Sequence, residues 1–153
     1  MGGSTDFSAA YNYTDTEVSD QGSVTSDSKV KRLEEGLPNH RATFTMNQNW
    51  EDLSAFVRAN YFGEYYAVHA DWFGNDADAA MTVDVEVTYN LSDNFNVSVG
   101  AQNIFDQKAE RIEGSAGAVE AGVPGNVLGA IYYETSPMGI EGAYWYMKAG
   151  YNF

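Results

Sequence analysis

Asp84 and Glu86 are the residues whose types and spacing come nearest to a catalytic pair. They lie two positions apart in an alternating segment, so both carboxylates would project from one face of a strand. The pair is like the two carboxylates that glycoside hydrolysis uses. The sequence offers no partner that would form a cleft around them. We therefore predict that the protein is not an enzyme and that no residue is catalytic.

Metal and thiol chemistry has little support. The chain has no cysteine and two histidines, His40 and His69, which argues against thiolate ligands and against a centre of several imidazoles. The acid-rich segment 64–78 could hold Ca²⁺ through carboxylate oxygens, and its Trp72 could stack a sugar. Its spacing does not match an EF-hand loop, so we favour a hydrated loop and predict no metal site and no cofactor.

The overall charge excludes one class of partner and leaves a puzzle. Of 153 residues, 22 are acidic and 8 are basic, giving a net charge of -14 that would repel nucleic acid. No stretch of about 18 apolar residues suggests a membrane-spanning helix. Aromatic residues make up 14% of the chain, which is unlike an acidic disordered protein. The chain is therefore expected to fold without binding nucleic acid.

Apolar residues recur at every second position rather than at helical spacing. This period predicts strands, since successive side chains of a strand point to opposite faces. The alternating segments predict an all-β, antiparallel meander of about six strands, at 5–14, 41–50, 53–62, 81–91, 95–105 and 143–153. Segments 28–35 and 106–112 could each form a short helical turn, but neither sustains an apolar stripe.

The predicted connections alternate between short and long. Tight turns follow 41–50 and 81–91, whereas 15–40, 62–80 and 106–142 are long loops. Short turns at one end and long loops at the other are typical of an outer-membrane β-barrel. The chain would then be a segment of a transmembrane barrel, with its long loops outside.

The two faces of the predicted strands differ in charge. One face carries no charged residue and has aromatic rings near its ends, as a lipid-facing band does. The other face carries the candidates for a substrate path, which could equally form cross-strand ion pairs: Arg41, Arg58, Asp84, Glu86 and Lys148. His69 and Trp72, in an external loop, are further candidates.

The carboxyl terminus resembles the last strand of bacterial outer-membrane proteins. Trp145, Tyr151 and the terminal Phe153 alternate along it, and in those proteins such a strand is read by the barrel-assembly machinery.

Three further segments resemble TonB-dependent receptors. Segment 90–107 is similar to their penultimate hairpin and includes the Asn-aliphatic-Phe-Asp signature, and 136–153 is similar to their last strand after a Pro-x-Gly-x-x-Gly loop exit. Segment 35–50 resembles a loop exit in which Pro and His precede a strand. The signature residues here are Asn103, Ile104, Phe105, Asp106, Pro137, Gly139 and Gly142.

The resemblance implies a receptor of the bacterial cell outer membrane with a plug domain, a TonB box and a barrel of about twenty-two strands. Residues 1–153 would be the carboxy-terminal portion of that barrel, with plug and TonB box absent. The implied function is TonB-coupled uptake of a scarce solute of the siderophore, vitamin or carbohydrate class. The implied partners are outer-membrane lipid, the rest of the barrel and plug, the TonB complex and an extracellular small molecule.

Two other interpretations remain open. The chain could be a small, complete eight-stranded outer-membrane barrel with a structural or adhesive role. That barrel would need extra strands around Val24 and Val30 or within 123–133. Alternatively, the strands could form a soluble β-sheet binding module.

Overall fold

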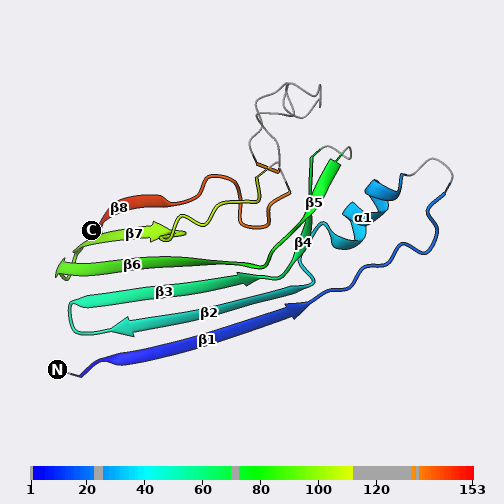
Figure 1. Cartoon of the computed structure of the whole chain (residues 1–153). Helices are drawn as coiled ribbons and strands as arrows, with labels where there is room; N and C mark the ends of the chain where they lie inside the picture. The colour runs from blue at the N-terminus through cyan, green and yellow to red at the C-terminus, as the bar shows by residue number, and fades with distance from the viewer. Residues whose placement is uncertain (1, 23–25, 70–72, 112–131, 134) are drawn as a thin grey trace, which may run out of the picture.

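One antiparallel sheet makes up most of the described molecule (Figure 1). The computed structural model describes residues 2–22, 26–69, 73–111, 132, 133 and 135–153. The sheet has the order β1-β2-β3-β6-β7-β8, so each strand lies beside its neighbours in the meander. Its strands are β1 (Ser4–Tyr13), β2 (His40–Asn49), β3 (Leu53–Phe62), β6 (Ala80–Ser92), β7 (Phe95–Gln102) and β8 (Tyr144–Tyr151).

These bounds confirm the six strands predicted from alternation, with one clear correction. The strand predicted at 95–105 ends at Gln102, because Asn103 and Asp106 have φ values of 50° and 56°. Residues with positive φ leave the extended region and turn the chain. Residues 103–105 therefore belong to a turn.

The predicted loops contain structure that alternation did not reveal. Segment 62–80, predicted as a loop, holds a separate hairpin of β4 (Tyr65–His69) and β5 (Phe73–Ala77). Helix α1 (Asp27–Glu35) occupies the segment 28–35 in which a short helical turn was possible, and Ser26 caps it by accepting a hydrogen bond from the Lys29 amide. Val30, a candidate for an additional strand, lies in this helix. Residues 106–111 form no helix.

The strand register places every apolar series on one face. One row runs across the sheet as Phe7, Met46, Val57, Val85, Ala101 and Trp145, and the adjacent row runs as Asp6, Asn47, Phe56, Glu86, Gly100 and Tyr146. We call these two sides the apolar face and the polar face. By the same register, the Asp, Glu, Lys and Arg residues of these six strands all lie on the polar face.

The apolar face is not covered by another layer in the described part of the chain. Phe7, Tyr11, Trp145 and Met147 have exposed fractions of 64%, 67%, 62% and 75%. The buried hydrophobic cluster lies elsewhere, at the small hairpin, and consists of Tyr65, Ala67, Ala77 and Tyr133. The accessible surface is 10102 Å², against about 7,700 Å² expected for a compact globular protein of this mass. The large sheet is therefore a single layer with exposed apolar side chains.

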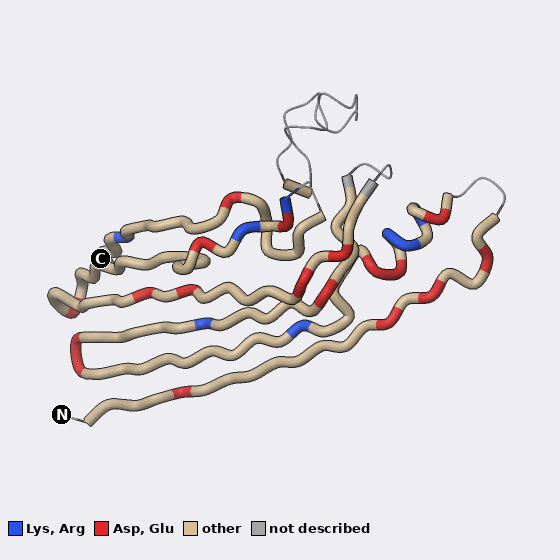
Figure 2. Tube along the Cα trace, viewed as in Figure 1, with Lys and Arg blue, Asp and Glu red and all other residues tan. Residues whose placement is uncertain are grey.

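Aromatic side chains occupy both ends of the apolar face. At the end nearer α1, the Tyr11 ring stacks on His40, the Tyr13 ring is tilted against it, and the Tyr11 hydroxyl lies 2.7 Å from His40 Nδ1. At the turn end, Trp50 and Tyr151 are exposed. Acidic residues lie in and around α1, β4 and β5 and also at the short turns, as the red segments of Figure 2 show. The strands thus present an apolar band bordered by rings.

Two edges of the main sheet remain open. Strand β1 pairs with β2, and β8 pairs with β7, and neither has a second neighbour among the described strands. No helix in the described ranges combines the length and the apolar character needed to cross a bilayer.

Candidate functional site on the polar face

An open cavity of about 730 Å³ lies on the polar face near the loop end of the sheet. Its floor comes from four strands, and residues 137–142 form its wall. The strand residues that line it are Asn60, Phe62, Thr82, Asp84, Gln102 and Tyr144. The cavity therefore combines amide, hydroxyl, carboxylate and aromatic groups.

Hydrogen bonds hold the floor of this cavity in place. Asn60 Nδ2 donates to Thr82 Oγ1 and to Asp84 Oδ2, both at 3.2 Å. The Asn103 backbone amide donates to Asp84 Oδ1 at 2.9 Å, and Thr43 Oγ1 donates to Asn60 Oδ1 at 3.4 Å. Because the Asp84 carboxylate is engaged at both oxygens, its orientation is fixed before any ligand arrives.

The wall of the cavity is attached at its first end to the small hairpin. The Val68 amide of β4 donates to Thr135 Oγ1 at 3.0 Å, and this hydroxyl lies 3.4 Å from the Val68 carbonyl oxygen. A buried strand therefore anchors the chain two residues before the wall.

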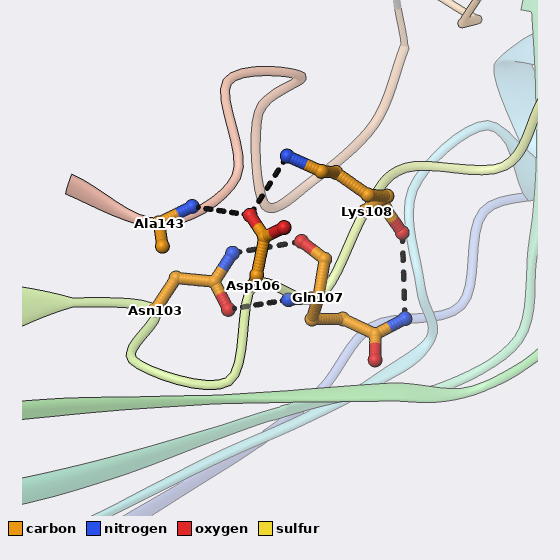
Figure 3. Close-up of polar contacts among 5 residues, drawn as sticks. All are labelled: Asn103, Asp106, Gln107, Lys108 and Ala143. Atoms are coloured by element: carbon orange, nitrogen blue, oxygen red, sulfur yellow. Dashed lines mark hydrogen bonds and ion pairs between the residues drawn. The ribbon is translucent and has the colours of Figure 1, made fainter.

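A group of polar contacts, which we call the clamp, attaches the second end (Figure 3). Asn103 Nδ2 donates to the Gln107 carbonyl at 2.7 Å, and the Gln107 amide donates to Asn103 Oδ1 at 2.9 Å. Asp106 Oδ1 accepts from the Ala143 amide at 2.8 Å and pairs with Lys108 Nζ at 2.7 Å. The clamp thus joins the turn after β7 to the residue before β8.

Gly142 fits the clamp because it has no side chain. Its φ is +76°, and a Cβ there would lie 2.4 Å from Asp106 Oδ1. A larger residue would be strained and would also displace the carboxylate. The Gly-x-x-Gly spacing seen in the sequence therefore has a local structural reason at its second glycine.

The clamp shifts the pKa values of its two charged groups. The hydrogen bond from Lys108, with help from the Ala143 amide, lowers the pKa of Asp106 below its ordinary 3.8. The same bond raises the pKa of Lys108 above its ordinary 10.5. The ionised Asp106 carboxylate stabilises the folded state. This stabilisation is complete above pH 3.8 and is lost as pH falls through the lowered pKa. The charged Lys108 ammonium group likewise stabilises the folded state, fully below pH 10.5, and this stabilisation is lost as pH rises through its raised pKa.

We therefore expect the Ala143 amide proton to report on Asp106 during an acid titration. Its NMR chemical shift should change with a midpoint below pH 3.8, since protonation removes the charged acceptor. Asp106→Asn should abolish this transition. A midpoint at or above 3.8 in the wild-type protein would contradict the clamp.

A second polar cluster lies nearer the turn end of the polar face. Tyr146 Oη donates to Glu86 Oε2 at 2.6 Å, and Lys148 Nζ donates to the same oxygen at 2.7 Å. The Tyr146 ring crosses β7 above Gly100, where a Cβ would lie 2.5 Å from Tyr146 Cζ and 2.8 Å from the Val85 carbonyl oxygen. Gly100 is thus required for the contact between β6 and β8.

Gly100→Ala is expected to destabilise the protein by about 1–3 kcal/mol, because it displaces Tyr146 and leaves Glu86 without one of its donors. Urea unfolding of the purified protein would measure this. Gly150→Ala is the matched control, since its Cβ would meet only the Asn96 side chain, at 2.9 Å. If both variants lose the same free energy of unfolding, the Tyr146 contact does not contribute to stability.

The polar-face residues singled out from the sequence fall into different places. Asp84 lines the cavity, whereas Glu86 and Lys148 form the ion pair. Arg41 lies 5.9 Å from the centroid of the Phe62 ring, and Arg58 lies 4.9 Å from that of Phe56. Although Asp84 and Glu86 share a face as predicted, each has its own set of partners, so they do not form one site.

The other residues singled out from the family resemblance either make structural contacts or are exposed. The Ile104 amide donates to the Val83 carbonyl at 2.8 Å, and Phe105 is exposed. Pro137 and Gly139 belong to the cavity wall. In the carboxy-terminal signature, Trp145, Tyr151 and Phe153 are exposed, and the last two rings meet edge to face at 5.1 Å.

The acid-rich segment 64–78 contributes both strands of the small hairpin. His69 belongs to β4, and Trp72 and Asp71 lie outside the described residues. Asp76 pairs with Lys31 of α1 at 2.7 Å, and this hydrogen bond raises the pKa of Lys31. Within the described ranges, no three His, Asp or Glu side chains are grouped as a metal site.

Sequence reasoning missed most of the cavity. Asn60, Thr82, Gln102 and Tyr144 were not singled out, although all four occupy polar-face positions of predicted strands. The available signal was their place near the same end of neighbouring strands. The Lys31–Asp76 pair joins residues 45 positions apart, which no local pattern indicates. Comparison with known proteins gives no match to a family profile, a curated protein or a solved structure.

Proposed function

We propose that this chain is the carboxy-terminal part of the barrel of a TonB-dependent outer-membrane receptor, which takes up a scarce solute. The observation that carries the proposal is the exposed, charge-free apolar face of the main sheet. In water such a face would be covered by a second layer. In a bilayer the hydrocarbon covers it.

Three features of the sheet support a lipid environment. The charged strand residues lie on the polar face, as in barrels whose interior is wet. Rings border the apolar band at both ends, where they would meet the lipid headgroups. Short turns lie at one end, and the hairpin, helix and cavity lie at the other. In this proposal the short turns face the periplasm and the cavity faces the outer mouth of the lumen.

The open edges support a larger barrel. Barrels of fewer than about eight strands do not close around a lumen, and unpaired backbone groups in lipid cost several kcal/mol each. Among the described strands, β1 and β8 each have one partner, so closure would use additional strands. The remainder of a receptor barrel would supply them, with the plug inside and TonB acting through the plug.

The gene itself provides a direct test. We expect the reading frame to continue upstream of Met1 and to encode a plug domain, and the product to fractionate with the outer membrane. Solute uptake should be lost when TonB is deleted. A stop codon followed by a true start at Met1 would exclude the receptor proposal, and a monodisperse monomer in plain buffer would exclude any membrane barrel.

A further inference from the structure

We propose that the cavity behind residues 137–142 binds a neutral, hydroxyl-rich ligand of the oligosaccharide class. Its role in uptake rests on the proposed receptor function, whereas its binding chemistry rests on the cavity alone. Four observations on the described residues lead to this ligand class.

The first observation is the charge of the lining. The charged side chains that line the cavity are Asp84 and Glu141, both acidic. Two basic side chains contact lining residues without lining the cavity themselves: Arg41 lies over the Phe62 ring, and Lys108 pairs with Asp106 beside Gly142. Two carboxylates without a lining cation repel an anion, so a phosphorylated, sulfated or carboxylate-rich ligand is disfavoured.

The second observation is the hydrogen-bonding capacity that remains. Both amide protons of Asn60 are used within the floor, whereas each Asp84 oxygen accepts one hydrogen bond and can accept another. The site therefore presents acceptors that need donors. A hydroxyl group donates and accepts, and a deprotonated anion cannot donate. Gln102, which is exposed beside the floor, can contribute a donor and an acceptor to the same ligand.

The third observation is the pair of rings at the cavity. Phe62, whose ring also has Arg41 over it, comes from β3, and Tyr144 comes from β8. The C–H groups of a sugar ring carry slight positive charge and pack favourably on the negative face of an aromatic ring. A cavity of about 730 Å³ also falls within the range of ordinary ligand sites.

The fourth observation is that the wall is held at both ends. Thr135 is bonded to Val68, and Ala143 is bonded to Asp106. A ligand therefore meets a wall that is already positioned, which lowers the entropic cost of binding.

The test uses the complete protein encoded by the gene, purified in detergent. Calorimetric titration would compare a panel of neutral tri- and tetrasaccharides with their sulfated counterparts. We expect at least one neutral member to bind and sulfation to weaken its binding at least tenfold. Gln102→Ala and Tyr144→Ala should each weaken binding of the neutral ligand about tenfold. Asn47→Ala, which lies on the same face outside this cavity, should have no effect.

One charge variant separates repulsion from loss of contacts. Glu141 lies in the exposed part of the wall, and Glu141→Gln should strengthen binding of the sulfated ligand relative to the neutral one, because it removes one of the two lining carboxylates. The proposal is overturned if no neutral member binds, if sulfated members bind better, or if Gln102→Ala and Tyr144→Ala leave binding intact. Outer-membrane fractionation is read separately, so failure of the ligand class and failure of the receptor function remain distinguishable.

Discussion

Val57→Arg is expected to destabilise the membrane-inserted protein by about 2–4 kcal/mol, which is the cost of a basic side chain at the middle of a barrel's lipid face. Val57 lies between Met46 and Val85 in the central row of the apolar face. An arginine there could neither reach the headgroups easily nor find a charged partner on that face. Urea unfolding in lipid vesicles would measure the loss, and the amount of protein in the outer membrane should fall with it.

Asn47→Arg is the matched control for this change. Asn47 belongs to the adjacent row on the polar face, directly opposite Asp6 of β1. An arginine would lie in a wet environment beside a carboxylate, so the effect should stay within about 0.5 kcal/mol. If Val57→Arg and Asn47→Arg have the same effect, the apolar face does not meet lipid. Greater solubility of Val57→Arg in plain buffer would favour the soluble-module interpretation.

The sheet could be predicted because the alternating pattern that specifies each strand lies within one short segment of the sequence. A period of two specifies which residues share a face, and a one-residue slip would reverse every side chain of a strand. The register of Met46 with Val57 and of Val87 with Val99 follows from tight turns joining strands of similar pattern. This is why bounds such as Leu53–Phe62 agree with the alternating segment.

The cavity was less predictable because it depends on contacts across distant segments. Asp84 was recognised as a polar-face residue, but its partner Asn103 was first placed in a continuing strand. The end of that strand depends on the left-handed backbone at Asn103, which alternation does not encode. The β4–β5 hairpin was missed because its segments are five residues long and its buried cluster includes Tyr133, far along the chain.

Asn103→Ala is expected to destabilise the clamp by about 2–4 kcal/mol through two separate effects. The Asn103 side chain is buried, with 7% exposed, and its loss leaves the Gln107 amide and carbonyl without partners. In addition, its φ of 50° disfavours alanine by about 1 kcal/mol or more, whereas asparagine tolerates this region. Hydrogen exchange at the Gln107 amide should accelerate accordingly, and exchange within β3 should not change.

Three further variants separate these effects. Asn103→Gly removes the hydrogen bonds but relieves the backbone, so it should be less damaging than alanine by about 1 kcal/mol. Asn103→Asp keeps an acceptor for the Gln107 amide and loses the donor to the Gln107 carbonyl. It should therefore lose less stability than the alanine and glycine variants. Phe105→Ala, in the same turn but 74% exposed, should leave the Gln107 amide protected. If alanine and glycine behave alike, backbone strain contributes nothing, and if aspartate is as damaging as alanine, the bond from the Gln107 amide does not hold the turn. The predicted order therefore assigns the effect to the side chain that closes the turn and sets the position of the cavity wall.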